Sequence, residues 1–185
     1  AYEHVQAVML ANDLVPAEKM PRLRDALLAG KLLPNSFGSF AYFLAAMMKT
    51  GPAGRAHISN YLQELFTPVA LAGATSLWET AYGSKDMGGA GSLCHAWSSV
   101  MPYFCNAYIL GIKPRQPGYR EFLVQPYPAH LTHAQGGVPT PAGEIRVSWQ
   151  RQGDGLAVEV SHPQGLTPVL EAYPEYPILK AQFVA

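Results

Sequence analysis

The apolar residues of this chain change their spacing near Gly111, and this change constrains the fold more than any other feature of the sequence. Before Gly111 they recur every three or four residues, which is the period of a helix with one buried face. After it they alternate, as in strands, and ten of the 16 prolines lie in residues 111–185. The sequence therefore predicts an α+β chain with a helical part over residues 1–112 and a β part over residues 113–185, divided within GIKPRQPG.

The helical part is expected to contain five helices, of which the first two form a short hairpin. The first covers AYEHVQAVML and ends at Asn12 and Asp13. The second runs from Pro16 to Gly30, with proline at its first turn and glycine as its stop. The predicted buried face of the first helix consists of Tyr2, Val5 and Met9.

The third, fourth and fifth helices have longer apolar stripes. The stripe of the third helix, which Thr50-Gly51-Pro52 closes, is made of Phe37, Phe40, Ala41, Leu44, Met47 and Met48. The fourth helix begins at about Ala56, and its stripe is made of Ile58, Leu62, Leu65, Phe66 and Val69. The fifth is expected from His95 to about Leu110, with a stripe made of Leu93, Trp97, Val100, Phe104 and Tyr108.

The β part contains two segments with strict alternation, EIRVSW and LAVEV, separated by the turn sequence RQGDG. This arrangement predicts a hairpin whose buried face is made of Ile145, Val147, Trp149, Leu156, Val158 and Val160. Further short strands are expected in REFLVQP, in residues 131–138 and in PVLEAY. Short strands separated by Pro and Gly are typical of an antiparallel β-sandwich, which is the arrangement we expect here.

Charge and composition exclude several classes of function. The 13 basic residues balance the 13 acidic ones, so no basic footprint for nucleic acid or an anionic membrane is present. Pro, Gly or a charge interrupts each apolar run well before the length of a membrane span, and we expect a soluble protein. The two cysteines have no metal-binding spacing, and no metal site is expected.

The stretch from Leu71 to Trp97 is the strongest candidate for a functional site. It places Trp78, Glu79, His95 and Trp97 around a glycine-rich loop between helical segments, and loops held by a rigid scaffold are where binding and catalysis usually occur. Taken alone, Glu79 is more often a carboxylate in a structural ion pair than a catalytic group. For His95, capping of a helix start and ligand binding are both open, and Trp97 is expected in the core of the fifth helix.

Four segments in order, GATSLWE, GSLCHAWSS, YILGIKPRQPGYREFLVQPYP and GGVPTPAGEIRVSW, resemble the C-terminal part of bacterial α-L-rhamnosidases of glycoside hydrolase family 78. The resemblance extends from about residue 2 to residue 160. It implies that the chain contains the last helices of an (α/α)6 six-hairpin catalytic barrel, followed by an antiparallel β-sandwich. The partners that it implies are a rhamnose-containing oligosaccharide or glycoside and the upstream part of the same catalytic domain.

The resemblance also implies roles for the site residues. Glu79 matches the general base, His95 matches a histidine that contacts sugar hydroxyls, and Trp78 and Trp97 could shape the sugar site or stack on the ring. Thr80-Ala81 departs from the commoner family pattern after the Trp-Glu pair.

Inverting hydrolysis of a glycoside needs an acid for the leaving oxygen and a base for the attacking water, several ångströms apart. The family's acid lies upstream of the segments matched here, so the chain by itself is expected to be inactive. No organic cofactor or metal is implied. Two other functions remain open: another glycosidase with the same barrel, and a non-catalytic carbohydrate-binding or structural module.

Overall fold

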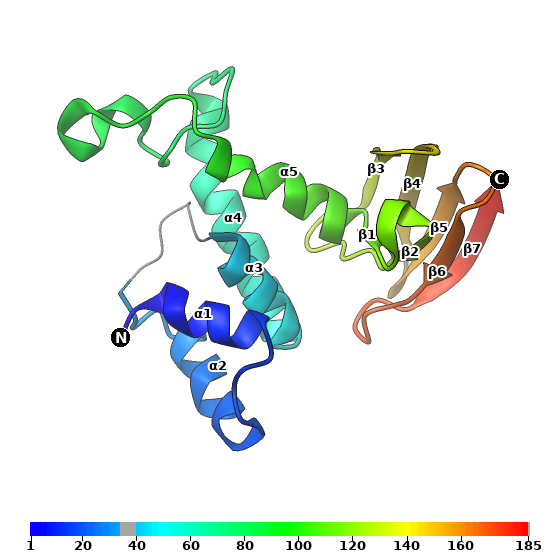
Figure 1. Cartoon of the computed structure of the whole chain (residues 1–185), viewed down its shortest axis with the longest axis horizontal. Helices are drawn as coiled ribbons and strands as arrows, with labels where there is room; N and C mark the ends of the chain where they lie inside the picture. The colour runs from blue at the N-terminus through cyan, green and yellow to red at the C-terminus, as the bar shows by residue number, and fades with distance from the viewer. Residues whose placement is uncertain (34–39, 185) are drawn as a thin grey trace. The chain divides into compact units, whose positions relative to one another are not determined.

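The computed structural model describes residues 1–33 and 40–184 as an α+β chain with two compact units, Ala1–Met101 and Pro102–Ala185 (Figure 1). The first unit is helical, and the second contains the strands. The division between them falls inside a short helix. The predicted contribution of Phe37 to the third helix lies outside the described residues.

The five predicted α-helices are all present among the described residues. They are α1 (Glu3–Ala11), α2 (Met20–Leu28), α3 (Phe40–Lys49), α4 (Pro52–Leu71) and α5 (Val100–Phe104). The fourth helix begins four residues earlier than expected, because Gly51 caps it at a φ of 85° and Pro52 fits the first turn. A 3₁₀ turn at Ala96–Ser99 precedes α5, and a π-helical turn at Cys105–Ile109 follows it.

The core of the helical unit forms around α3, which packs against both α1 and α4. Most of the predicted stripes of α3 and α4 are buried as expected. The fully buried side chains here are Leu10, Leu27, Phe40, Phe43, Leu44, Met47, Ile58 and Leu62. These side chains account for most of the apolar area that stabilises this unit.

The predicted buried face of α1 is wrong. Tyr2, Val5 and Met9 are exposed, and the buried residues of α1 are Glu3, Ala7 and Leu10. These three residues lie at i, i+4 and i+7, which is also a single helix face. α1 packs against α3, and the face of Glu3, Ala7 and Leu10 is its buried one.

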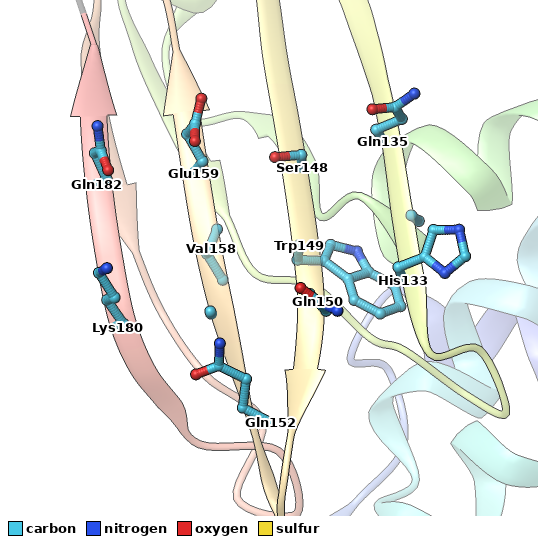
Figure 2. Close-up of a pocket in the computed structure, with 12 residues that line it drawn as sticks. His133, Gln135, Ser148, Trp149, Gln150, Gln152, Val158, Glu159, Lys180 and Gln182 are labelled. Atoms are coloured by element: carbon cyan, nitrogen blue, oxygen red, sulfur yellow. The ribbon is translucent and has the colours of Figure 1, made fainter.

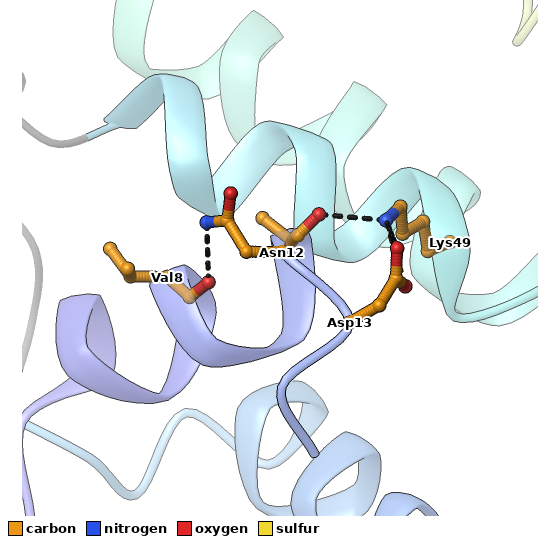
Figure 3. Close-up of polar contacts among 5 residues, drawn as sticks. Val8, Asn12, Asp13 and Lys49 are labelled. Atoms are coloured by element: carbon orange, nitrogen blue, oxygen red, sulfur yellow. Dashed lines mark hydrogen bonds and ion pairs between the residues drawn. The ribbon is translucent and has the colours of Figure 1, made fainter.

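The turn after α1 is tied to the end of α3 (Figure 3). The Lys49 ammonium donates to the Ala11 carbonyl at 2.7 Å and to the Asp13 carboxylate at 2.9 Å. Asn12 is the C-terminal cap of α1, and its side-chain amide donates back to the Val8 carbonyl at 2.8 Å. The predicted end of the first helix is therefore confirmed.

The fifth helix differs from the single regular helix that was expected. The 3₁₀ turn at Ala96–Ser99 has about three residues per turn, so Trp97 does not align with the stripe that follows it. Val100, Phe104 and Tyr108 are buried as predicted, whereas the Trp97 side chain is 67% exposed. The expectation that Trp97 packs in the core is therefore wrong.

The strands of the second unit form two mixed sheets. The first sheet, in the order β1-β2-β6, is made of β1 (Ile112–Pro114), β2 (Glu121–Val124) and β6 (Thr167–Leu170). The second, in the order β3-β4-β5-β7, is made of β3 (His133–Thr140), β4 (Gly143–Gln152), β5 (Gly155–Ser161) and β7 (Ile178–Val184). The expected hairpin is β4–β5, and its six predicted core residues are buried.

The expectation of purely antiparallel strands is wrong for two pairs. β6 pairs with β2 in parallel, and β7 pairs with β5 in parallel. Both pairs join segments that are far apart in the chain, and antiparallel hairpins can form only between strands joined by short turns. Local alternation could not reveal this orientation.

The start of the second unit is joined to its sheets by the buried Trp149. The Trp149 indole N–H donates to the Ile109 carbonyl at 2.7 Å, from β4 to the end of the π-helical turn. Gly111 follows at a φ of 80°, and its carbonyl accepts a hydrogen bond from the Gln125 amide at 3.0 Å. A Cβ at Gly111 would stand 2.2 Å from the Gln125 carbonyl carbon, so only glycine fits at this position.

Candidate active site

The candidate site is built on a long loop between the end of α4 and the 3₁₀ turn at Ala96–Ser99. Its two ends run alongside each other in antiparallel fashion. The Glu79 amide donates to the Ser92 carbonyl at 2.9 Å, and the His95 amide donates to the Leu77 carbonyl at 2.8 Å. The Ser76 hydroxyl also donates to the Leu93 carbonyl. These contacts bring residues 13 and more positions apart in the sequence into one small framework.

The glycines of the loop make this framework possible. Gly83 has a φ of 56°, and a Cβ there would lie 2.7 Å from the Trp78 ring and 2.9 Å from the Leu93 side chain. A Cβ at Gly91 would stand 2.1 Å from the Gly83 carbonyl oxygen. The Trp78 ring therefore covers Gly83, and its half-buried side chain holds the loop together.

Glu79 and His95 lie next to each other at the base of the loop. One carboxylate oxygen of Glu79, Oε2, accepts a hydrogen bond from the Ser92 amide at 3.1 Å. The other, Oε1, lies 3.9 Å from His95 Nδ1. The Glu79 side chain is 26% exposed and the His95 side chain 30%. The carboxylate is therefore fixed by a backbone donor on one side and remains accessible to solvent, and it is not part of a buried ion pair.

Trp97 extends the group formed by Glu79 and His95. Its ring lies 6.2 Å from the His95 ring, edge to face. The next residue, Ser98, is fully buried, and its hydroxyl donates to the Trp78 carbonyl. The chain is thus fixed directly after Trp97, while the indole itself is exposed. An exposed indole beside a carboxylate and an imidazole can stack on the apolar face of a sugar ring.

The structure brings Glu79, His95 and Trp97 together and places Trp78 as their support. Glu79 lies on the loop, eight residues after α4 ends at Leu71. Gly73 adopts a φ of 69° two residues after the end of α4 and turns the chain away from the helix. The contributions of the Ser92 amide and of the Ser98 hydroxyl were missed. The sequence does not indicate which backbone amide will donate a hydrogen bond to a given side chain.

Cavities in the described residues occur on the second unit, and Glu79 lines none of the three that stand out there. That Glu79 points into a sugar-sized cavity therefore stays a prediction. Among the described residues, no group of three or more His, Cys, Asp or Glu side chains is placed to hold a metal ion. The described helices include none long and apolar enough for a membrane span.

The chain is similar in sequence to known α-L-rhamnosidases. Residues 111–171 match the model of the bacterial α-L-rhamnosidase C-terminal domain. The chain is 33% identical over 116 residues to an α-L-rhamnosidase of Alteromonas sp. (strain LOR), and 34% identical over 106 residues to one of Formosa agariphila. These alignments cover 59% and 54% of this chain. The chain is similar to the C-terminal region of bacterial α-L-rhamnosidases.

The rhamnosidases of known structure share the fold. The family 78 rhamnosidase of Bacillus sp. GL1 superposes with a TM-score of 0.83 over 99% of this chain, at 22% identity. The α-L-rhamnosidase of Streptomyces avermitilis, solved in complex with L-rhamnose, gives a TM-score of 0.75 over 91% of this chain, at 24% identity. The chain spans 12% and 11% of the two curated relatives, and 20% and 18% of these two solved chains.

Proposed function

We propose that this chain supplies the general base of an inverting α-L-rhamnosidase, and that Glu79 is that base. The observation that carries the proposal is the geometry of Glu79. Its carboxylate is held by the Ser92 amide, stays partly exposed and lies beside His95 and the open indole of Trp97. A general base must be fixed in position and must still be reached by water, and this arrangement meets both conditions.

In this mechanism, Glu79 takes a proton from the water that attacks the anomeric carbon. The backbone bond at Oε2 orients the carboxylate, so that Oε1 is the oxygen available to the water. A second carboxyl group, supplied by a segment outside residues 1–185, protonates the leaving oxygen. In inverting glycosidases the two carboxyl groups stand roughly 6.5–9.5 Å apart, which leaves room for the water.

His95 and Trp97 bind the sugar in this proposal, and Trp78 shapes the site from behind. The His95 ring nitrogens can exchange hydrogen bonds with hydroxyl groups, and Trp97 offers an apolar face. The substrate class is a glycoside or oligosaccharide with a terminal α-L-rhamnosyl residue. The names of the relatives support this choice, because they are α-L-rhamnosidases.

The same proposal covers the domain organisation. Residues 1–112 would be the last helices of an (α/α)6 catalytic barrel, and residues 113–185 a β-sandwich domain. The superposition on the Bacillus sp. GL1 rhamnosidase over nearly the whole chain supports this division. The exposed apolar residues of α1, which are Tyr2, Val5 and Met9, are the kind of surface that further helices of a barrel would cover.

Substitution of Glu79 by glutamine tests the proposal in the complete polypeptide that carries this chain. Glu79→Gln keeps the shape of the side chain and removes the base, so kcat for an aryl α-L-rhamnoside should fall by about 10²-fold or more. Glu64→Gln is the matched control, because Glu64 is an exposed carboxylate on α4 outside the site. It should leave kcat unchanged.

The stereochemistry of the product completes the test. Proton NMR of the sugar released first should show the anomer opposite to that of the substrate. Retention of configuration would reject the role of Glu79 as a base for water. Full turnover in Glu79→Gln would favour a non-catalytic module, and hydrolysis of another glycoside in preference to rhamnosides would favour a different barrel glycosidase.

A further inference from the structure

The outer face of the second sheet is hollowed across all four of its strands (Figure 2). The hollow has a volume of about 570 Å³. A neighbouring hollow of about 380 Å³ shares Gln135, Ser148 and Glu159 with it, so the two are continuous along the strands. Together they form a trough whose walls and floor belong to the second unit alone.

The strand register places polar side chains across the trough in rows. One row runs Gln135, Ser148, Glu159, Gln182 from β3 to β7. The next runs His133, Gln150, Ala157, Lys180. Since alternate residues of a strand point to opposite faces, the residues between them, such as Trp149 and Val158, are buried on the other side.

The chemistry of the trough differs from an ordinary solvated face, because its side-chain amides outnumber its charged groups. Gln135, Gln150, Gln152 and Gln182 each carry both a donor and an acceptor. Charged groups are few and balanced, with Glu159 and Lys180 in the main hollow. Arg146, which lines the neighbouring hollow, is already paired with Glu144.

Six polar side chains of the main hollow have no polar partner among the described residues. Within the described part of the chain, the side chains of the row Gln135, Ser148, Glu159 and Gln182 form no hydrogen bond or ion pair. The same holds for Gln150 and Lys180. The row therefore presents a set of free donors and acceptors at fixed spacing on a rigid sheet.

We propose that this trough, which we call the amide trough, binds a neutral carbohydrate chain. Rows two residues apart along a strand are about 7 Å apart, and the trough extends over several such rows. A linear array of this kind matches a chain of hydroxyl groups. The balanced charge does not favour a polyanion such as nucleic acid, and the rows of polar side chains do not favour a lipid.

The amide trough goes beyond the proposed hydrolysis, because all its residues lie in the second unit and Glu79 lies in the first. It offers no exposed Phe, Tyr or Trp ring, so a single short ligand should bind weakly and longer chains should bind better by contacting more rows. Its role would be to hold a polymeric substrate while the catalytic site acts on it.

Titration of the ¹⁵N-labelled complete polypeptide that carries this chain with neutral oligosaccharides tests the amide trough. The probes are a rhamnose-containing oligosaccharide and a glucose oligosaccharide of equal length, with oligogalacturonate as a charged comparison. Amide shifts in residues 133–161 and 178–184 are expected with at least one neutral probe. They should persist in Glu79→Gln, which separates this site from the proposed catalytic one.

A double variant in the trough provides the decisive comparison. The double variant Gln150→Ala/Gln182→Ala removes two amides from neighbouring rows and should lower the affinity of the amide trough for the oligosaccharide by about three- to tenfold. Gln63→Ala, on the exposed face of α4, is the matched control and should bind like the parent chain. Unchanged binding in the double variant would overturn the proposal, as would the absence of sheet shifts with both neutral probes or binding of oligogalacturonate alone.

Discussion

Trp149 provides the sharpest test of how the second unit is held together. Its side chain is 2% exposed, and its indole N–H is bonded to the Ile109 carbonyl. Trp149→Phe keeps an aromatic ring in the core but removes this donor. The loss of a buried hydrogen bond with one partner left behind costs about 1–3 kcal/mol, and the smaller ring leaves a cavity that costs about 1 kcal/mol more.

Hydrogen exchange followed by mass spectrometry measures this loss where it occurs. The free energy of opening of the peptides that cover β4 and β5 should fall by about 2–4 kcal/mol, while that of peptides from α3 and α4 should not change. Trp97→Phe is the matched control, because an exposed indole contributes little to stability, and it should change protection by less than about 0.5 kcal/mol. Equal effects of the two substitutions would refute the view that Trp149 joins the sheet to the preceding helical turn.

Three further predictions follow from close contacts and from burial. Burial lowers the pKa of Lys113 from 10.5 to about 8, so between pH 8 and pH 10 the folded chain has lost this proton while the unfolded chain still holds it, and the free energy of unfolding should rise with pH. Urea unfolding of Lys113→Met should not show that rise, and an unchanged rise would contradict the prediction. Gly111→Ala should cost about 2–5 kcal/mol in thermal unfolding, against about 1–2 kcal/mol for Gly165→Ala, which has a similar φ but open space around it. Gly83→Ala should displace the Trp78 ring and lower rhamnoside turnover by about 10- to 100-fold. Gly88→Ala, where the added Cβ has no atom within 4 Å, should change turnover by no more than about twofold, and equal losses in the two variants would exclude Trp78 as a support of the site.

Much of the fold could be predicted because it depends on local periodicity. The stripe of α4 and the hairpin β4–β5 follow directly from spacings of 3.6 and two residues. The strands β1 and β7 were missed for different reasons. β1 is three residues long and contains a lysine and a proline, and β7 is exposed along most of its length, so neither shows strict alternation.

The errors in the first unit arise from competition between helix faces. In α1 two faces are possible, and the buried one is that of Glu3, Ala7 and Leu10. The sequence favoured the face with the larger side chains. Similarly, Trp97 matches the spacing of the stripe in α5 only if the helix is regular, and the 3₁₀ turn shifts it out of line.

The location of the candidate site could be predicted from its residue types, but the contacts that orient its side chains could not. Glu79, His95 and Trp97 were grouped from their place around a glycine-rich loop, and their proximity is seen in the structure. The contact that orients Glu79 comes from the amide of Ser92, and every residue except proline offers such an amide. Only the folded path of the loop shows which amide is used.

The parallel strands β6 and β7 have a consequence for synthesis on the ribosome. The helices of the first unit need only near neighbours, so they can pair as soon as they emerge. Both sheets, in contrast, gain their last member from residues 167–184: β6 begins 43 residues after β2 ends, and β7 begins 17 residues after β5 ends. Until then β2 and β5 each expose an unpaired edge, and we expect the nascent β region to be most vulnerable to misassociation and to chaperone capture during that interval.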